Sequence, residues 1–176
     1  AGLSPDGQPP VVLTPDAVSE IHREGGSCLG SSRAKVNVDV MVDRLVELGV
    51  NLLFLVGGDG TLAGAHAIAQ ETLRRGLPIA VVGIPKTIDN DIELVYRSFG
   101  FETAVEEARR VLDCAHIEAR GMDRGIGLVK LMGRDSGFIA AHATLASGDV
   151  NYCLVPEIPF ALHGDHGILN HLRERL

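Results

Sequence analysis

The chain has 176 residues, of which 45% are hydrophobic and 22% are charged, and its formal net charge is −7. This length and composition are typical of one soluble α/β domain, or of one domain with part of another. The negative charge argues against a nonspecific nucleic-acid binder, which presents a basic face to phosphates. No apolar stretch reaches the roughly 20 residues that span a bilayer, and the first residues lack a signal-peptide pattern.

The cysteines and histidines do not match a metal motif. Cys28, Cys114 and Cys153 are odd in number and widely spaced, which fits neither a disulfide framework nor a zinc site. We therefore expect reduced thiols in a cytoplasmic protein. Three histidines near the end of the chain also lack zinc spacing, and a polar helix start explains them better: His163, His166 and His171.

Taken in chain order, the first half alternates between helix and strand. We expect a short helix from Thr14 to the Gly25–Gly26 pair, and a second helix over residues 36–48, where apolar side chains keep helical spacing. The apolar run over 50–56 predicts a strand buried on both faces. A helix from about 63 to 75 and another buried strand over 77–85 follow.

The second half continues this alternation. We expect helices over 101–118 and 136–148 and from about His166, with strands over 125–132 and 151–158. The pattern is typical of βαβ units, so it predicts an α/β fold with a doubly wound, mainly parallel sheet. Ligands bind such sheets at the carboxyl ends of the strands, where this sequence carries three polar loops that we expect to share one cleft.

The first loop is "GGDGT", residues 57–61. Its glycines let backbone N–H groups approach an anion, and the following helix N-terminus favours negative charge. Asp59 would repel a phosphate unless a divalent cation joins the two, as Mg²⁺ does in phosphoryl-transfer sites. The plain alternative is a tight turn in which this aspartate caps the helix.

The second loop carries carboxylates and the third loop carries an arginine. In "PKTIDNDI", residues 85–92, Asp89 and Asp91 flank Asn90 and would face the same way in an extended turn. A kinase needs such a carboxylate to accept the proton of the attacking hydroxyl. The alternative is an Asx-turn beside a solvated lysine. In "MGRDSG", residues 132–137, a helix N-terminus and Arg134 together suit a phosphate or a sugar. The alternative for this loop is an ordinary surface arginine after a strand.

Four strings, in this order and at these separations, resemble the 6-phosphofructokinase family: "GGDGT", "PKTIDNDI", "FGFETAVEEA" and "MGRDSGFIA". "GGSCLGSSR" is similar to that family's phosphate-contacting loop, and "VPEIPFALHG" to a segment after its sugar-binding helix. The resemblance covers about residues 20–170. Lipid kinases and NAD kinases share "GGDGT" but do not carry "PKTIDND".

The resemblance implies transfer of a phosphoryl group to the 1-hydroxyl of fructose 6-phosphate, a glycolytic reaction that uses Mg²⁺. It implies that Asp89 is the general base, that Thr87 and Asp91 line the site of transfer, and that Asp59 acts around Mg²⁺. The implied donor contacts are Arg33, Gly57, Gly58, Gly60, Thr61 and Lys86. The implied sugar-phosphate contacts are Met132, Gly133 and Arg134.

The resemblance also implies two parts: a donor-binding domain over residues 1–97 and the start of a sugar-phosphate-binding domain over 98–176. The family's amino-terminal glycine-rich donor loop has no counterpart here, nor do its later acidic and basic sugar contacts. We therefore expect an internal fragment of a homo-oligomeric enzyme. The fragment would be incomplete at both ends and inactive by itself.

The expected donor is ATP. Pyrophosphate users in the family resemble one another in having aspartate where Gly60 stands and lysine where Lys86 stands. This chain has the lysine without the aspartate, a combination similar to the ATP-using plant and trypanosome enzymes. The alternatives are a pyrophosphate-dependent phosphofructokinase and a noncatalytic subunit that binds phosphorylated ligands. Loss of the carboxylate at Asp89 would favour the noncatalytic alternative, and that carboxylate is present.

Overall fold

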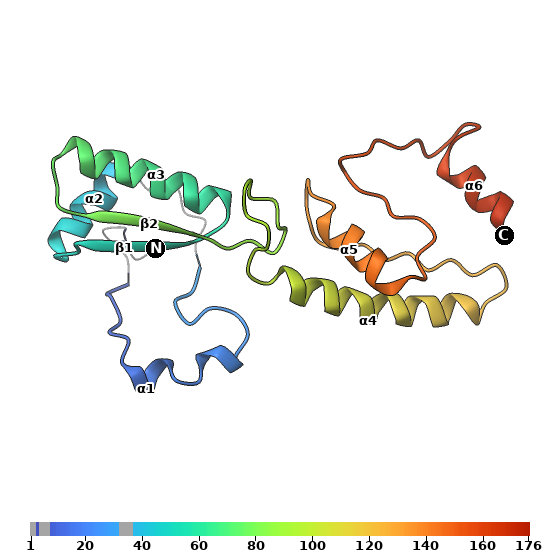
Figure 1. Ribbon diagram of the computed structural model, residues 1–176, viewed down its shortest axis with the longest axis horizontal. Helices are drawn as coiled ribbons and strands as arrows, with labels where there is room; N and C mark the ends of the chain where they lie inside the picture. Colours follow the sequence, from blue (N-terminus) through green and yellow to red (C-terminus); the bar gives the residue numbers. More distant parts are fainter. Residues whose placement is uncertain (1–2, 4–7, 32–36) are drawn as a thin grey trace. The chain divides into compact units, whose positions relative to one another are not determined.

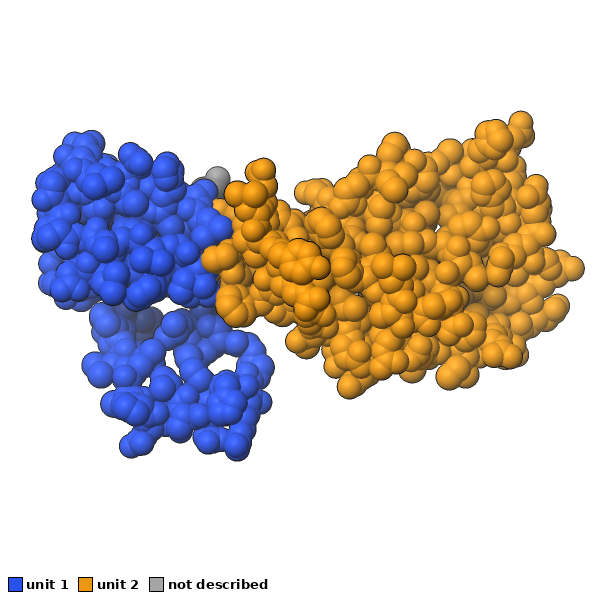
Figure 2. All heavy atoms as spheres, viewed as in Figure 1, with its two compact units in different colours: residues 1–56, 60–84 blue, residues 57–59, 85–176 orange. Residues whose placement is uncertain are grey.

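The computed structural model describes residue 3 and residues 8–31 and 37–176 (Figure 1). The chain folds into two compact units, coloured in Figure 2: residues 1–56 with 60–84, and residues 57–59 with 85–176. The boundary that we expect near residue 97 divides a donor-binding domain from a sugar-phosphate-binding domain. That division stays a prediction.

Most of a parallel β-α-β element lies in the first unit, and its residues 57, 59 and 85 belong to the second. The element consists of β1 (Leu52–Gly57), α3 (Asp59–Arg74) and β2 (Ala80–Pro85). The Ala80 N–H donates to the Asn51 carbonyl at 2.9 Å, and the Lys86 N–H donates to the Gly57 carbonyl at 2.7 Å. The partners of both bonds are equally far apart in the chain, so the two strands run parallel. The α/β class with a parallel sheet is therefore confirmed.

The core of this unit lies where α2 (Val38–Glu47) and α3 meet one face of the sheet. The expected apolar spacing of α2 brings Val42 and Leu45 into full burial beside Ile68 of α3. The Asn37 side chain caps α2 by accepting the Asp39 N–H at 2.9 Å, an N-cap role typical of asparagine. Strand residues that pack against this core include Leu53, Leu55 and Val81.

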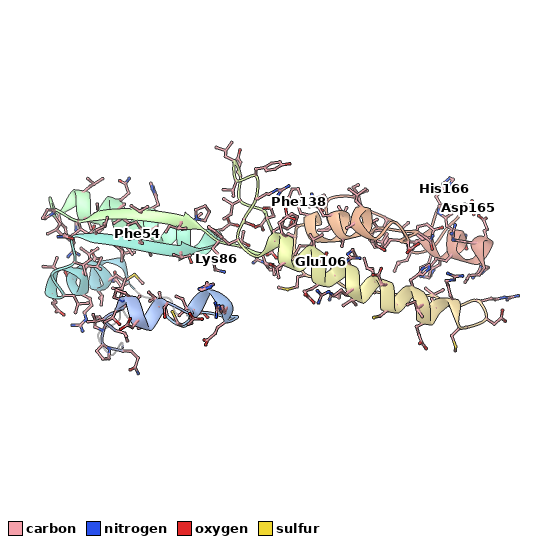
Figure 3. The ribbon with its side chains drawn as sticks, turned by 60° about the horizontal axis from the view of Figure 1, so that its bottom comes forward. Phe54, Lys86, Glu106, Phe138, Asp165 and His166 are labelled. Atoms are coloured by element: carbon pink, nitrogen blue, oxygen red, sulfur yellow. The ribbon has the colours of Figure 1, made fainter. Side chains whose placement is uncertain are left out.

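The burial predicted for the strand over 50–56 is wrong on one face. Leu53 and Leu55 pack against the core, whereas Leu52, Phe54 and Val56 alternate with them and stay 49%, 55% and 51% exposed. Figure 3 labels Phe54 on this strand. Successive strand side chains point to opposite faces, so a strand is buried on both only where both faces are covered. In the described residues, the sheet has two strands and buries a core on one face.

A charged cluster joins the end of α3 to α2. The Arg75 guanidinium donates to the carboxylates of Glu71 and Asp43, and to that of Asp39 at 2.8 Å. Glu71 also accepts from Arg74 at 2.6 Å and 2.7 Å. Hydrogen bonds from Arg74 and then Arg75 lower the pKa of Glu71 from 4.5 to about 2. Hydrogen bonds and charge pairing from these carboxylates raise the pKa of Arg75.

We expect Glu71→Gln to destabilise the protein at neutral pH and to weaken its response to acid. A carboxyl whose folded pKa is depressed contributes stability above its unfolded pKa, and that contribution disappears as the pH falls through the folded value. The window for Glu71 runs from about pH 4.5 down to about pH 2. Urea unfolding at pH 7, 4 and 3 should show the two proteins converging as the pH falls.

Glu47→Gln is the matched control, because the Glu47 side chain, which pairs with Arg44 at 2.9 Å, is 64% exposed. Exposed pairs contribute little to stability. A stability difference for Glu71→Gln that stays the same at all three pH values would contradict this role of the Arg75 cluster.

The second unit has two long packed helices. α4 (Phe101–Arg120) packs along α5 (Phe138–Ser147), and the rings of Phe101 and His142 meet edge to face at 5.0 Å. The expected helices over 101–118 and 136–148 are thus confirmed. A further helix, α6 (Ile168–Arg175), begins two positions after His166.

The strands predicted over 125–132 and 151–158 are not present in the structure, which describes both segments as irregular chain. Their apolar side chains are partly exposed, with Leu128 at 88% and Leu154 at 43%. A strand needs a neighbour for its backbone hydrogen bonds, and the described residues offer these segments none. Both segments are apolar, as the sequence shows, but the prediction that they form strands is wrong.

Near the amino terminus, the helix expected from Thr14 to Gly25–Gly26 begins as predicted but ends early: α1 covers Pro15–Val18, and a separate 3₁₀ turn, η1, covers Ile21–Arg23. The Thr14 hydroxyl accepts the Ala17 N–H at 3.2 Å and so caps α1. The three cysteines are free and exposed. Within the described ranges, no helix is both long enough and apolar enough to cross a membrane.

Candidate functional site

The turn after β2 places a carboxylate in a buried position. Asp89 is 7% exposed, and its N–H donates to the Thr87 hydroxyl at 3.3 Å. Asn90 follows with φ at +56°, a left-handed conformation that asparagine tolerates better than most residues. These local bonds agree with the alternative of an ordinary Asx-turn. The burial of Asp89 does not, because a buried carboxylate loses its hydration and needs partners.

Ser98 holds this turn from the segment that follows it. Ser98 is 6% exposed; its N–H donates to Asn90 Oδ1 at 2.8 Å, and its hydroxyl donates to the Thr87 carbonyl. The Asn90 amide in turn donates to the Tyr96 carbonyl at 3.2 Å. The backbone around Asp89 is therefore fixed by side-chain hydrogen bonds rather than by a regular element.

The loop before α5 meets the same turn. Arg134 Nε lies 3.5 Å from Asp89 Oδ2, and the Ser136 hydroxyl donates to the Asp89 carbonyl at 3.0 Å. The Arg134 side chain is 75% exposed, whereas that of Asp89 is 10% exposed. The second and third polar loops are thus brought together, as the sequence predicts. Arg134 is free to reach a ligand.

Glycine is required at position 133 of this loop. Gly133 has φ at +142°, and an added Cβ would lie 2.0 Å from the Ser136 carbonyl oxygen. The Ser136 N–H donates to the Gly133 carbonyl at 2.7 Å, which closes the loop. Arg134 itself takes φ at +46° between them. This tight turn is what aims the arginine at Asp89.

The first loop also reaches the turn after β2. The Gly57 carbonyl accepts the Lys86 N–H, and a Cβ on Gly58 would stand 3.5 Å from the Thr87 Cβ. The expected loop is shorter than predicted, because α3 begins at Asp59 rather than near residue 63. Residues 59–61 therefore form the first turn of α3. N–H groups in the first turn of a helix lack carbonyl partners within it and attract anions.

Asp59 and Gly60 occupy different surroundings in that first turn. The Asp59 carboxylate is exposed, and its position at a helix N-terminus is favourable for a negative charge. This agrees with the plain alternative of a helix-start aspartate and leaves the carboxylate accessible to a cation. A Cβ added to Gly60 would meet no atom within 4 Å.

The remaining predicted residues are less closely assembled. Lys86 is exposed just beyond β2, as labelled in Figure 3, and Met132 is 63% exposed. Arg33 lies outside the described residues. Asp91 lines a cavity of about 580 Å³ that Asp89 does not line. Other residues in the wall of that cavity include Asn90, Tyr96, Phe101, Asp135, Ser136 and Phe138.

Sequence reasoning missed Ser98 and Ser136 as parts of this site. Both are buried polar residues, and both donate hydroxyl hydrogen bonds to carbonyls of the turn that holds Asp89. A serine in a loop carries no local signal for such a role. Only the distance in space between segments 87–90 and 136 reveals it.

These features define a class of protein. A parallel α/β sheet ends in a glycine-rich helix start, a buried carboxylate and an exposed arginine, which together suit the binding and transfer of phosphoryl groups. The comparison with known families then gives the particular family. The phosphofructokinase family model matches residues 2–176. The chain belongs to the phosphofructokinase family.

Curated relatives carry a consistent name. The chain is 53% identical over 176 residues to an ATP-dependent 6-phosphofructokinase of Borreliella burgdorferi, covering 99% of this chain and 39% of the relative. It is 55% identical over 159 residues to ATP-dependent 6-phosphofructokinase 1 of Arabidopsis thaliana, covering 90% and 34%. For the Trypanosoma cruzi enzyme of that name, identity is 57% over 145 residues, covering 82% and 30%. The chain thus spans less than half the length of these relatives.

A solved structure has a similar fold. The pyrophosphate-dependent phosphofructokinase from Marinobacter aquaeolei superposes with a TM-score of 0.66 at 27% identity, covering 84% of this chain and 39% of that one. Its name records a different phosphoryl donor from that of the relatives above. The shared fold therefore does not decide the donor.

Proposed function

We propose that the full-length protein transfers a phosphoryl group from ATP to the 1-hydroxyl of fructose 6-phosphate, giving fructose 1,6-bisphosphate. By full-length protein we mean the chain as its cell makes it, whatever its length. The observation that carries the proposal is the buried Asp89 carboxylate, which lies 3.5 Å from the exposed Arg134. The names of relatives that are 53–57% identical support the same reaction and the same donor.

In this proposal, Asp89 accepts the proton of the attacking sugar hydroxyl. Its burial favours the role, because a general base works best where water does not compete for the proton or screen its charge. Thr87 and Asp91 flank it along the turn and line the site of transfer. Arg134, with Met132 and Gly133, binds the sugar phosphate, and a planar guanidinium suits phosphate oxygens well.

The donor phosphates occupy the glycine-rich start of α3. The backbone of Gly57, Gly58, Gly60 and Thr61 lies along the donor, with Lys86 and Arg33 as the cations beside it. The open space around Gly60 supports a close approach by a phosphate. A Cβ added to Gly58 would lie 3.5 Å from the Thr87 Cβ, so this part of the loop lies next to the proposed site of transfer.

We propose Asp59 as the residue that holds Mg²⁺. An exposed carboxylate beside free helix N–H groups fits the ion, because Mg²⁺ in kinase sites uses one or two carboxylates together with substrate phosphates and water. When bound, Mg²⁺ neutralises charge on the donor phosphates. In this proposal the Asp59 carboxylate binds the ion, and the helix N–H groups bind the donor phosphates.

We expect Asp59→Ala to raise the Mg²⁺ concentration that gives half-maximal activity in the full-length protein. The variant removes the one carboxylate of the glycine-rich loop and leaves the helix intact. Magnesium titrations at fixed ATP and fructose 6-phosphate measure this directly. Asp16→Ala, at the first turn of α1, is the control. An unchanged titration for Asp59→Ala would remove Asp59 from the metal site.

The proposed function itself is tested by offering fructose 6-phosphate with ATP or with pyrophosphate. Faster turnover with ATP supports the proposal, and faster turnover with pyrophosphate favours the pyrophosphate-dependent alternative. Binding of both substrates without turnover favours the noncatalytic subunit. We also propose that the protein is cytoplasmic, since the cysteines are free thiols. We further propose a homo-oligomer, as the family resemblance implies, and sedimentation of the full-length protein would test its assembly.

A further inference from the structure

Ser136 connects two loops that the proposed reaction needs in register. Its N–H donates to the Gly133 carbonyl at 2.7 Å, within the arginine loop. Its hydroxyl donates to the Asp89 carbonyl at 3.0 Å, within the turn that carries the proposed base. Ser136 is 7% exposed, so water competes little for either bond.

Ser136 is itself held in place. Gly137 follows it at the start of α5, and the Gly137 N–H donates to Glu157 Oε1 at 2.8 Å. A Cβ on Gly137 would lie 2.4 Å from the Val155 Cβ, so the backbone at this point is tightly packed. Because its backbone is fixed, the Ser136 hydroxyl can hold the Asp89 carbonyl in place. A hydroxyl on a mobile loop would move together with its acceptor and would not position it.

The other connection between these loops is easily broken. The Arg134 guanidinium pairs with Asp89 at 3.5 Å, but its side chain is 75% exposed. The Arg134 end of this pair is open to water, and 3.5 Å is longer than a typical hydrogen bond between charged groups. When Arg134 binds a phosphate, as the proposed function requires, the bond from Ser136 to the Asp89 carbonyl remains.

We propose that Ser136 is a positioning residue for the reaction: its buried hydroxyl holds the Asp89 turn in place while Arg134 binds the sugar phosphate. The inference rests on the proposed function for its catalytic consequence. Ser136 lines the same cavity as Asp91, and we propose that it acts through the Asp89 turn rather than on a substrate. Its removal should therefore slow the chemical step and leave substrate binding nearly unchanged.

The test uses Ser136→Ala in the full-length protein. We expect kcat to fall roughly tenfold, because misplacing a catalytic group by about 1 Å costs up to about a hundredfold. KM for both substrates should stay within about twofold, since a change confined to kcat reports an interaction that matters only in the transition state. Hydrogen exchange of the segment 86–98 should become faster.

Ser147→Ala is the matched control, because that serine lies at the far end of α5 and its hydroxyl bonds only locally, to the Asp149 N–H at 3.4 Å. It should change neither kcat nor exchange in segment 86–98. If Ser136→Ala does not fold, Ser136→Cys replaces it, because a thiol keeps the volume and donates only weakly.

A kcat within about twofold of the unmutated protein would overturn the proposal, and so would an effect on KM alone. If the unmutated protein shows no turnover, the proposed function has failed, and the exchange measurement alone decides the role of Ser136. Faster exchange in segment 86–98 would then uphold its hold on the Asp89 turn, and unchanged exchange would overturn it.

Discussion

Asp89→Asn should lower the turnover of the full-length protein by roughly a hundredfold or more, because general-base help is worth about 10²–10⁴. Asparagine has nearly the same shape, and its side chain can occupy the same buried position, 7% exposed. The amide cannot accept the proton of the sugar hydroxyl at neutral pH. Fructose 6-phosphate binding should persist, because Arg134 is exposed and does not depend on Asp89 for its charge.

Stopped-assay turnover and equilibrium sugar binding measure the two effects separately. Asp113→Asn on α4 is the control, since its contact with Arg109, at 3.7 Å, is exposed and far along the chain from the turn. The unfolding midpoint in urea shows whether the Asp89 variant keeps its fold. Turnover within a few fold of the unmutated protein would exclude Asp89 as the base.

Gly60→Asp should lower ATP-dependent turnover by about tenfold or more, a factor for which roughly 1.4 kcal/mol is enough. Position 60 lies in the first turn of α3, where the inner phosphate of a nucleotide is proposed to pass. A carboxylate there would fill that space and repel the phosphate charge. The structure makes this a clean test, because a Cβ at position 60 meets no atom within 4 Å.

An aspartate in the first turn of a helix is favourable, so the variant should fold at least as well as the unmutated protein. Gly60→Ala separates size from charge, and we expect it to retain more ATP-dependent turnover than Gly60→Asp. Pyrophosphate should be tested with both variants. Equal ATP-dependent turnover in Gly60→Asp and the unmutated protein would show that residue 60 does not face the donor.

The sequence by itself determined the elements whose signals are local. The apolar spacing of α2, the start of the first helix after Thr14 and the long α4 could be predicted, because each signal lies within a few residues of the element it specifies. The three polar loops were readable for the same reason. Glycines, carboxylates and an arginine after apolar runs are unusual enough to indicate a site. The asparagine cap of α2 was not predicted.

Tertiary structure decided how those pieces pair. The segments over 125–132 and 151–158 have the composition of strands, but a strand exists only where another strand accepts its hydrogen bonds. The exposed face of β1 follows from the same dependence on neighbours, because no local pattern states whether a second layer covers a sheet.

The same reason explains the site. Sequence patterns indicated Asp89 and Arg134 separately, and the family resemblance gave each a role. Neither could indicate that Ser98 and Ser136 bond to carbonyls of the Asp89 turn, since Ser136 reaches it from 47 residues away. Hydrogen bonds between distant segments depend on the folded path of the chain, and a serine has the same local pattern whether or not such a partner lies beside it.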